Sequence, residues 1–329
     1  MDQRQRTKRF GLCVILCALL LRLAADGLLR KGLLRLLQTA APLHTYSETG
    51  HAVRFSASSE VFSPHFRESP APWLPEDEKL RFSAEDARLV ELYNTSGKQP
   101  DPDALLRQPL NWQLAGAEPT VLILHTHGSE SYTPADEPYT AISGYRTLDE
   151  AYNMLSIGDA VAAVLEENGI GVIHDRQLHD YPSYNGSYVH ARKAISGYLE
   201  DHPEILLVLD LHRDASGSPG RQLRTEALVN GEVSAQLMLV MGTNYDSWEE
   251  NLALAAKLHA RLEQQHPGIM RPINLRSQRF NQDLSPGALL VEVGAAGNTR
   301  QEALIAVREL GKAIASLAAG TESIPDDRE

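Results

Sequence analysis

Two kinds of apolar pattern alternate along the chain from about residue 120 onward. Short runs rich in Val, Ile and Leu are typical of buried strands, whereas apolar residues that recur every three or four positions are typical of helices. The pattern predicts strands at residues 121–124, 171–175, 205–212 and 288–294, and helices at 149–168, 189–202, 247–265 and 299–317. Because strands and helices alternate, we expect a single α/β domain of three layers, with a mostly parallel sheet covered on both faces.

A further pair of strands is predicted at RTEALV and SAQLMLVMG, joined at Asn230-Gly231. Asn-Gly is a strong signal for a tight hairpin turn, because both residues tolerate positive φ.

The first 37 residues have a different pattern. Eight Lys and Arg against two Asp in residues 1–35 surround an uncharged apolar run at residues 10–21. We interpret residues 1–37 as a cytoplasmic basic head and an uncleaved signal anchor that crosses the membrane once, which places the acidic remainder outside the cytoplasm. A cleaved signal peptide, or a cytosolic protein with an apolar leading helix, are the alternatives.

Composition divides the rest of the chain. Residues 38–119 are rich in Ser, Pro and mixed charge, and we expect a low-complexity stalk or linker that is largely disordered. The folded domain is expected at residues 120–320, followed by a disordered tail at 321–329. Both cysteines, Cys13 and Cys17, lie in the apolar segment, so an exported domain would have neither disulfides nor thiolate ligands.

The charge balance excludes one class of function. The chain has a net charge of −12, and the part after residue 35 carries −18. Binding to nucleic acid depends largely on neutralising phosphates with Lys and Arg. We therefore exclude nucleic-acid binding.

Polar residues at two strand ends indicate a metal site. His127 and Glu130 follow the strand at 121–124, and His212 ends the strand at 205–212. Carboxyl ends of parallel strands meet at one edge of a sheet, so these side chains are expected to converge there. Two imidazoles and one carboxylate, with a coordination position left open, are typical of catalytic zinc. His125 is an alternative or additional ligand, since the i, i+2 spacing of an extended chain puts it on the same side as His127, and Glu150 is an alternative to Glu130.

Glu292 is the candidate catalytic base, because it lies within the apolar strand Val291-Glu292-Val293. A buried carboxylate is costly unless it is paired or functional, although a solvent-facing position on an edge strand is also compatible with the pattern. Glu292 could take a proton from an activated water and return it to a leaving amine, which amounts to amide hydrolysis. Arg213 could hold a substrate carbonyl or carboxylate, and Asp210 could orient an imidazole.

Three motifs, HTHGSESYTP, LDLHRDA and NQDLSPGALLVEVGAAGNT, occur in this order behind the apolar segment. In these motifs the chain resembles the stage II sporulation protein P family, from about residue 120 to the end. The resemblance implies a membrane-anchored, zinc-dependent peptidoglycan hydrolase. It would be an N-acetylmuramoyl-L-alanine amidase, also credited with endopeptidase activity, that acts beside a lytic transglycosylase during engulfment of the forespore. It further implies that His127, Glu130 and His212 are metal ligands and that Glu292 is the catalytic carboxylate.

Two other functions remain as alternatives at this point. A zinc carboxypeptidase or endopeptidase that acts on stem peptides would use the same residues. A non-catalytic wall-binding scaffold is the other, and the complete set of two histidines and two glutamates speaks against it, because a binding module needs no open metal position.

Overall fold

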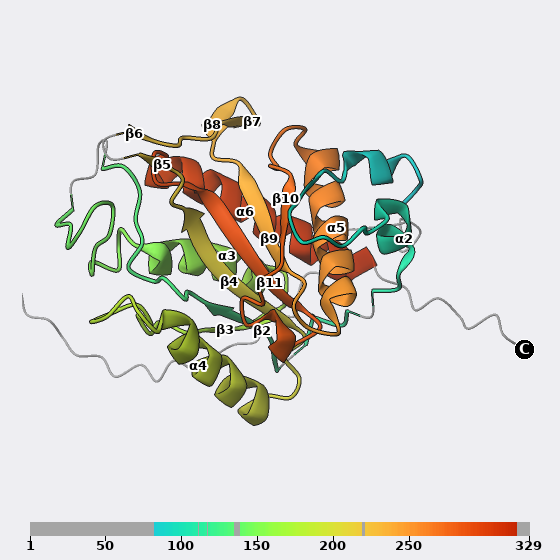
Figure 1. Ribbon diagram of the computed structural model, residues 1–329, viewed down its shortest axis with the longest axis horizontal. Helices are drawn as coiled ribbons and strands as arrows, with labels where there is room; N and C mark the ends of the chain where they lie inside the picture. The colour runs from blue at the N-terminus through green and yellow to red at the C-terminus, as the bar shows by residue number, and fades with distance from the viewer. Residues whose placement is uncertain (1–81, 111, 117, 135–138, 219–220, 321–329) are drawn as a thin grey trace, which may run out of the picture. The chain divides into compact units, whose positions relative to one another are not determined.

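A seven-stranded sheet forms the centre of the computed structural model, which describes residues 82–110, 112–116, 118–134, 139–218 and 221–320 (Figure 1). In order across the sheet, the strands are β1 (Leu92–Asn94), β10 (Ile273–Arg276), β9 (Leu237–Gly242), β11 (Ala288–Ala295), β4 (Leu207–Asp214), β2 (Pro119–Leu124) and β3 (Gly171–His174). Of the described neighbouring pairs, only β9 and β11 run antiparallel. The prediction of a mostly parallel sheet is therefore confirmed.

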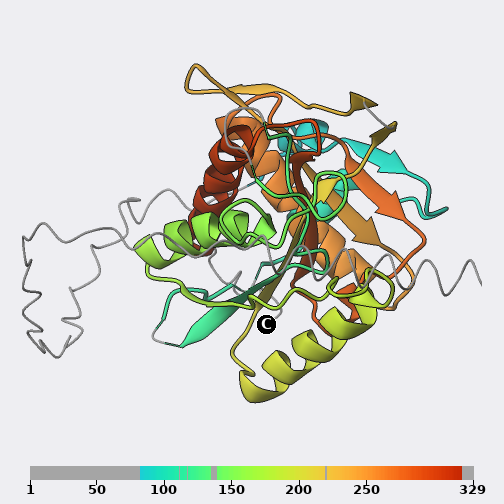
Figure 2. The same cartoon turned by 90° about the vertical axis from the view of Figure 1, so that its left-hand side faces the viewer.

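Helices cover both faces of the sheet, which confirms the three layers. The helices are α2 (Pro102–Arg107), α3 (Met154–Glu167), α4 (Ser187–Asp201), α5 (Trp248–Gln265) and α6 (Arg300–Gly320), with short 3-10 turns η1 (Asp86–Leu89) and η2 (Gln282–Leu284). Figure 2 shows α4 on one side of the sheet and α3, α5 and α6 on the other. The larger part of the core lies on the side of α3, α5 and α6, and a smaller apolar cluster lies beneath α4.

Side chains along β4 project alternately from the two faces of the sheet, and this determines which of them can reach the site. Leu209 and Leu211 pack into the large core, so Asp210 and His212 project from the opposite face, which is the face of α4. On β11, Val291 and Val293 pack into the large core, so Glu292 projects from the α4 face as well. The fold thus directs the polar residues of two neighbouring strands to one side.

The hairpin prediction is confirmed at its turn but is wrong about its second strand. Asn230 and Gly231 both have positive φ, 53° and 86°, and they join β7 (Ala227–Val229) to the short strand β8 (Glu232–Ser234). The apolar run that was expected to complete the hairpin instead forms β9 in the central sheet. Its side chains are buried along its whole length, and a two-stranded hairpin cannot provide that burial. A second small hairpin, β5 (Gly217–Ser218) with β6 (Arg221–Gln222), was not predicted.

The expected stalk is also corrected, because its second half is folded. β1 pairs with β10 at the sheet edge, and α2 packs against α5. The buried apolar residues of this segment are few and stand among polar ones, so the average composition did not indicate a folded segment. They include Val90, Leu105, Leu106, Trp112 and Leu114. Residues 1–81 and 321–329 lie outside the described residues, and with them the expected head, anchor and tail. Within the described ranges, no helix is long and apolar enough to cross a membrane.

Candidate metal-dependent active site

The carboxyl ends of β2, β4 and β11 meet at the candidate site. In the register of the sheet, Glu292 lies directly beside His212, and Leu124, the last residue of β2, lies beside Asp210. The chain leaves β2 and makes a turn, in which Glu130 N–H donates to the carbonyl of His127. The turn brings both side chains above the neighbouring strands.

The structure brings His127, Glu130 and His212 together. The imidazoles of His127 and His212 lie edge to face, with ring centroids 5.3 Å apart. Nδ1 of His212 lies 3.9 Å from Oε2 of Glu130. All three residues are buried. These are the three residues that the sequence singled out as ligands.

Asp210 controls the charge of His212. Its carboxylate accepts hydrogen bonds from the N–H and hydroxyl of Thr126, at 2.8 Å and 2.6 Å, and its Oδ1 lies 2.9 Å from Nε2 of His212. Burial opposes ionisation of both groups, but the mutual attraction and these hydrogen bonds dominate. They lower the pKa of Asp210 to about 2 and raise the pKa of His212 to about 9. For His127, burial and the nearby His212 lower the pKa to about 4.

Glu292 faces this group from β11. Burial, together with the nearby Glu130, raises the pKa of the Glu292 carboxyl to about 8, although His212 acts in the opposite direction. Its Oε2 is shielded from solvent and has no hydrogen-bond partner among the described residues. Glu292 therefore points into the site, and the alternative of a solvent-facing carboxylate does not hold.

Arg213 is held by backbone carbonyls and lies near Glu130. Its Nε and one terminal nitrogen donate to the carbonyls of Ser131 and Tyr145, at 2.9 Å and 3.0 Å. The other terminal nitrogen lies 3.6 Å from Oε1 of Glu130. Two guanidinium nitrogens therefore bind backbone carbonyls, while the third lies beyond hydrogen-bond distance of Glu130. The expected contact with a substrate carbonyl or carboxylate stays a prediction. Burial raises the pKa of the Glu130 carboxyl, and the nearby Arg213 acts in the opposite direction.

His125 lies on the other face of the sheet, contrary to the expectation that it would share a side with His127. Its Nδ1 lies 3.0 Å from the carbonyl of Leu211, and its Nε2 lies 2.9 Å from Nε2 of His174. Burial and the neighbouring His174 lower the pKa of His125 to about 3. The reason is that the chain is extended only as far as residue 125. The turn that follows reverses the side on which His127 projects.

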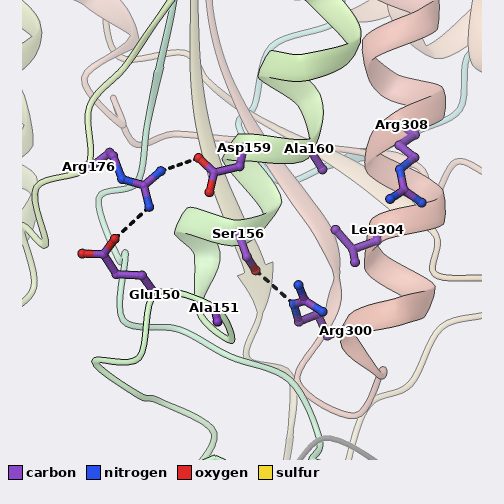
Figure 3. Close-up of a pocket in the computed structure, with 9 residues that line it drawn as sticks. All are labelled: Glu150, Ala151, Ser156, Asp159, Ala160, Arg176, Arg300, Leu304 and Arg308. Carbon is purple, nitrogen blue, oxygen red and sulfur yellow. Dashed lines mark hydrogen bonds and ion pairs between the residues drawn. The ribbon is translucent and has the colours of Figure 1, made fainter. Parts of the chain in front are cut away.

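Glu150 is likewise separate from the two histidines. It lines a surface hollow of about 490 Å³ between α3 and α6, where its Oε2 accepts from Arg176 at 2.8 Å (Figure 3). Arg176 also contacts Asp159 of α3. Of the two carboxylates that the sequence left open as ligands, Glu130 is the one beside His212.

The donor set fits a zinc ion in its chemistry. Two buried atoms at the site have no hydrogen-bond partner among the described residues: Nδ1 of His127 and Oε2 of Glu292. Such atoms are costly in a protein interior and are usually explained by a function or a bound ion. Two imidazoles and one carboxylate are ligands that zinc favours. In the described part of the chain, however, no three His, Cys, Asp or Glu side chains are close enough to form a complete metal site.

Two tyrosines, Tyr184 in the loop before α4 and Tyr188 at the start of α4, contact the histidines of the site, and the sequence analysis missed them. The ring of Tyr184 stacks on His127 with centroids 4.4 Å apart, and its hydroxyl lies 3.1 Å from Nε2 of that residue. Tyr188 lies edge to face with His127 and stacks against His212. The signal was present as the run YPSYNGSY, but a loop of this composition is typical of many surfaces.

Comparisons with known proteins agree with the family resemblance of the sequence. The family model described as stage II sporulation protein P matches residues 57–315. The stage II sporulation protein P of Bacillus subtilis (strain 168) is 28% identical over 246 residues, which cover 71% of this chain and 58% of that protein. The chain therefore spans less than two thirds of the length of this curated relative.

Two solved amidases are more distant. The N-acetylmuramoyl-L-alanine amidase AmiC2 of Nostoc punctiforme is 18% identical, covers 62% of this chain and 96% of its own, and gives a TM-score of 0.35. The N-acetylmuramoyl-L-alanine amidase from Clostridium difficile 630 is 15% identical, with coverages of 61% and 95% and a TM-score of 0.37. Since the family model matches well over half of the residues, the chain belongs to the stage II sporulation protein P family.

Proposed function

We propose that the chain is a zinc-dependent peptidoglycan hydrolase of sporulation that cleaves the amide bond between N-acetylmuramic acid and L-alanine. The observation that carries the proposal is the convergence of His127, Glu130 and His212 with Glu292 facing them. Membership of the family supports the sporulation context and the wall substrate.

The residues of the site divide into three tasks. His127, Glu130 and His212 would hold the zinc ion, which supplies a Lewis acid that polarises the amide carbonyl. Asp210 and Arg213 keep His212 and Glu130 in place from behind. Glu292 would transfer the proton from the attacking water to the amide nitrogen.

Glu292 suits proton transfer because of where its carboxyl lies. It stands on β11 directly beside His212, and its Oε2 is shielded from solvent without a hydrogen-bond partner among the described residues, as a general acid and base at this site requires. In the reaction, Glu292 removes a proton from the attacking water as oxygen bonds to the lactyl carbonyl carbon. It then gives that proton to the amide nitrogen as the C–N bond breaks. The products are the lactyl carboxylate and the free amine of L-alanine.

The location belongs to the proposal as well. An apolar segment at residues 10–21 behind a basic head supports a single-pass membrane anchor with the catalytic domain outside the cytoplasm. Peptidoglycan is then within reach of the site. A lytic transglycosylase that cuts the glycan strand is the partner that the family resemblance implies.

The test uses the full chain, purified peptidoglycan and mass analysis of the products. We expect the wild type with zinc to release stem peptides with a free L-alanine amine, and Glu292→Gln to lose about 10²- to 10⁴-fold in rate. Glu150→Gln is the matched control, since it makes the same chemical change in the hollow between α3 and α6, and it should retain activity.

Different products identify the alternatives. Peptides cut between stem-peptide residues, with the lactyl amide intact, would show a carboxypeptidase or endopeptidase. Binding to the wall without any cleavage would show a scaffold. Full activity of Glu292→Gln would refute the proton-transfer role.

A further inference from the structure

His127 belongs to a ring of five residues that contact one another. Apart from His127, none of them is a candidate ligand. The members of the ring come from three segments: the turn after β2, the loop before α3 and the loop before α4. They are His127, Ser129, Arg146, Asp180 and Tyr184. The proposed chemistry uses only the first of these five.

Asp180 is the fixed point of the ring. Its carboxylate is buried and accepts three groups: the N–H of Ser129 at 3.2 Å, the hydroxyl of Ser129 at 2.7 Å and a terminal nitrogen of Arg146 at 2.7 Å. Charge-assisted hydrogen bonds of this kind are the stronger ones in proteins, particularly when they are shielded from water. Asp180 therefore ties the loop before α4 to the turn that carries His127.

Arg146, which is held by Asp180, contacts the ring of Tyr184. Its Nε donates to the hydroxyl of Ser129 at 2.9 Å, and its guanidinium carbon lies 4.8 Å from the centroid of the Tyr184 ring. Cation–π contact at this distance is favourable and restricts the ring. The phenol of Tyr184 is half exposed, yet it is held against two neighbours at once.

Tyr184 in turn restrains His127. The two rings are nearly parallel, 6° between planes, and the hydroxyl lies 3.1 Å from Nε2. The other ring nitrogen, Nδ1, is buried without a hydrogen-bond partner among the described residues. An imidazole that binds a metal through one nitrogen is usually oriented through the other. The geometry matches this division of roles.

We infer that Tyr184, Arg146 and Asp180 are positioning residues that hold the His127 imidazole in the orientation needed for metal binding. The inference rests on the proposed function, because it assumes that His127 binds zinc. It assigns roles to three residues outside the ligand set.

The experiment measures the zinc dissociation constant of the full chain by competition with a chromogenic chelator. We expect about 10- to 100-fold weaker binding for Tyr184→Ala, and a loss of about tenfold for Asp180→Asn, which keeps the size but removes the charge. Tyr184→Phe should lie between Tyr184→Ala and the wild type, because it keeps the stacked ring and lacks the hydroxyl. Tyr181→Phe is the matched control on the same loop, where the side chain is equally exposed, and it should bind zinc like the wild type.

A second measurement separates positioning from mere stability. Thermal unfolding is recorded with chelator and again with zinc. We expect the metal-free melting temperature of Tyr184→Ala to match the wild type, whereas the rise produced by zinc should shrink. A tenfold weaker affinity corresponds to about 1.4 kcal/mol less stabilisation at saturating zinc.

The outcomes are distinct. If Tyr184→Ala and Asp180→Asn bind zinc as tightly as the wild type, the inference is overturned while the proposed function stands. If the variants lose metal-free stability and keep zinc affinity, the ring is structural only, and the inference is again wrong. If the wild type itself binds no zinc, the proposed function fails first, and the inference falls with it.

Discussion

Tyr132 links the motif that carries His127 and Glu130 to the strand that carries Glu292. Its ring is 1% exposed, and its hydroxyl donates to the carbonyl of Val293 at 2.8 Å. Val293 follows Glu292 directly, in the part of β11 where the register with β4 shifts. The Tyr132 hydroxyl therefore restrains the backbone of β11 next to Glu292.

The change Tyr132→Phe removes this hydrogen bond and little else. A buried carbonyl that loses its donor costs about 1 to 3 kcal/mol, so we expect a loss of about 2 kcal/mol in the free energy of unfolding. For a domain of this size, that corresponds to about 4 to 8 °C in melting temperature. Because the carboxyl of the adjacent Glu292 would be less firmly placed, the rate of wall cleavage should fall as well.

Thermal unfolding of the full chain, followed by circular dichroism, measures the effect. Tyr93→Phe is the matched control, because Tyr93 lies on β1 and is 63% exposed, and a change at such a position should leave stability within about 0.5 kcal/mol. If Tyr132→Phe melts at the same temperature as the wild type and Tyr93→Phe, the hydrogen bond to Val293 contributes nothing, and the reasoning about β11 is refuted.

Three further predictions concern the metal, the packing of α3 and the ionisation of a buried lysine. Zinc affinity in a chelator competition should fall in Glu130→Gln and be unchanged in Glu150→Gln, because only the first carboxylate lies beside His212; equal affinities would mean that the ligand set is wrong. Gly158→Ala should destabilise the protein by about 1 to 3 kcal/mol in urea unfolding, since its Cβ would clash with ring nitrogens of the buried His125 and the partly buried His174. Gly197→Ala, where the new Cβ meets nothing within 4 Å, should not destabilise it. Burial lowers the pKa of Lys257 to about 8, so below that pH the folded state bears the cost of a buried charge, and this cost disappears as the pH rises toward about 10.5. Relative to Lys257→Met, the wild type should thus gain up to about 3 kcal/mol between pH 8 and pH 10.5; a pH-independent difference in urea unfolding would contradict this.

The convergence of His127, Glu130 and His212 could be predicted because the rule behind it is topological. Buried strands can be recognised in the sequence by their apolar composition. The residues that follow them meet at one edge of a parallel sheet. His212 and Glu292 needed only that rule, together with alternation along the strand. The side on which His125 projects could not be predicted, because it depends on where the extended chain ends and the turn begins.

The missed elements share a different cause. β1 and β10 contain three and four residues, too few for a period of two to stand out, and they are strands only because neighbours exist for them to pair with. The contacts of Tyr184 and Tyr188 with His127 and His212 join segments far apart in the sequence. Local patterns contain no information about such contacts, whereas the long helices α5 and α6 were found within a few residues.

The pairing of β1 with β10 has a practical consequence for where the domain can be cut. A fragment that starts at Thr120, where the apolar pattern becomes regular, would lack β1 and α2. Without β1, β10 would become an unpaired edge strand that other chains could pair with. Without α2, the surface of α5 that α2 contacts would be exposed to solvent. A soluble fragment for crystallisation or assay should therefore begin no later than Phe82, where the described chain starts.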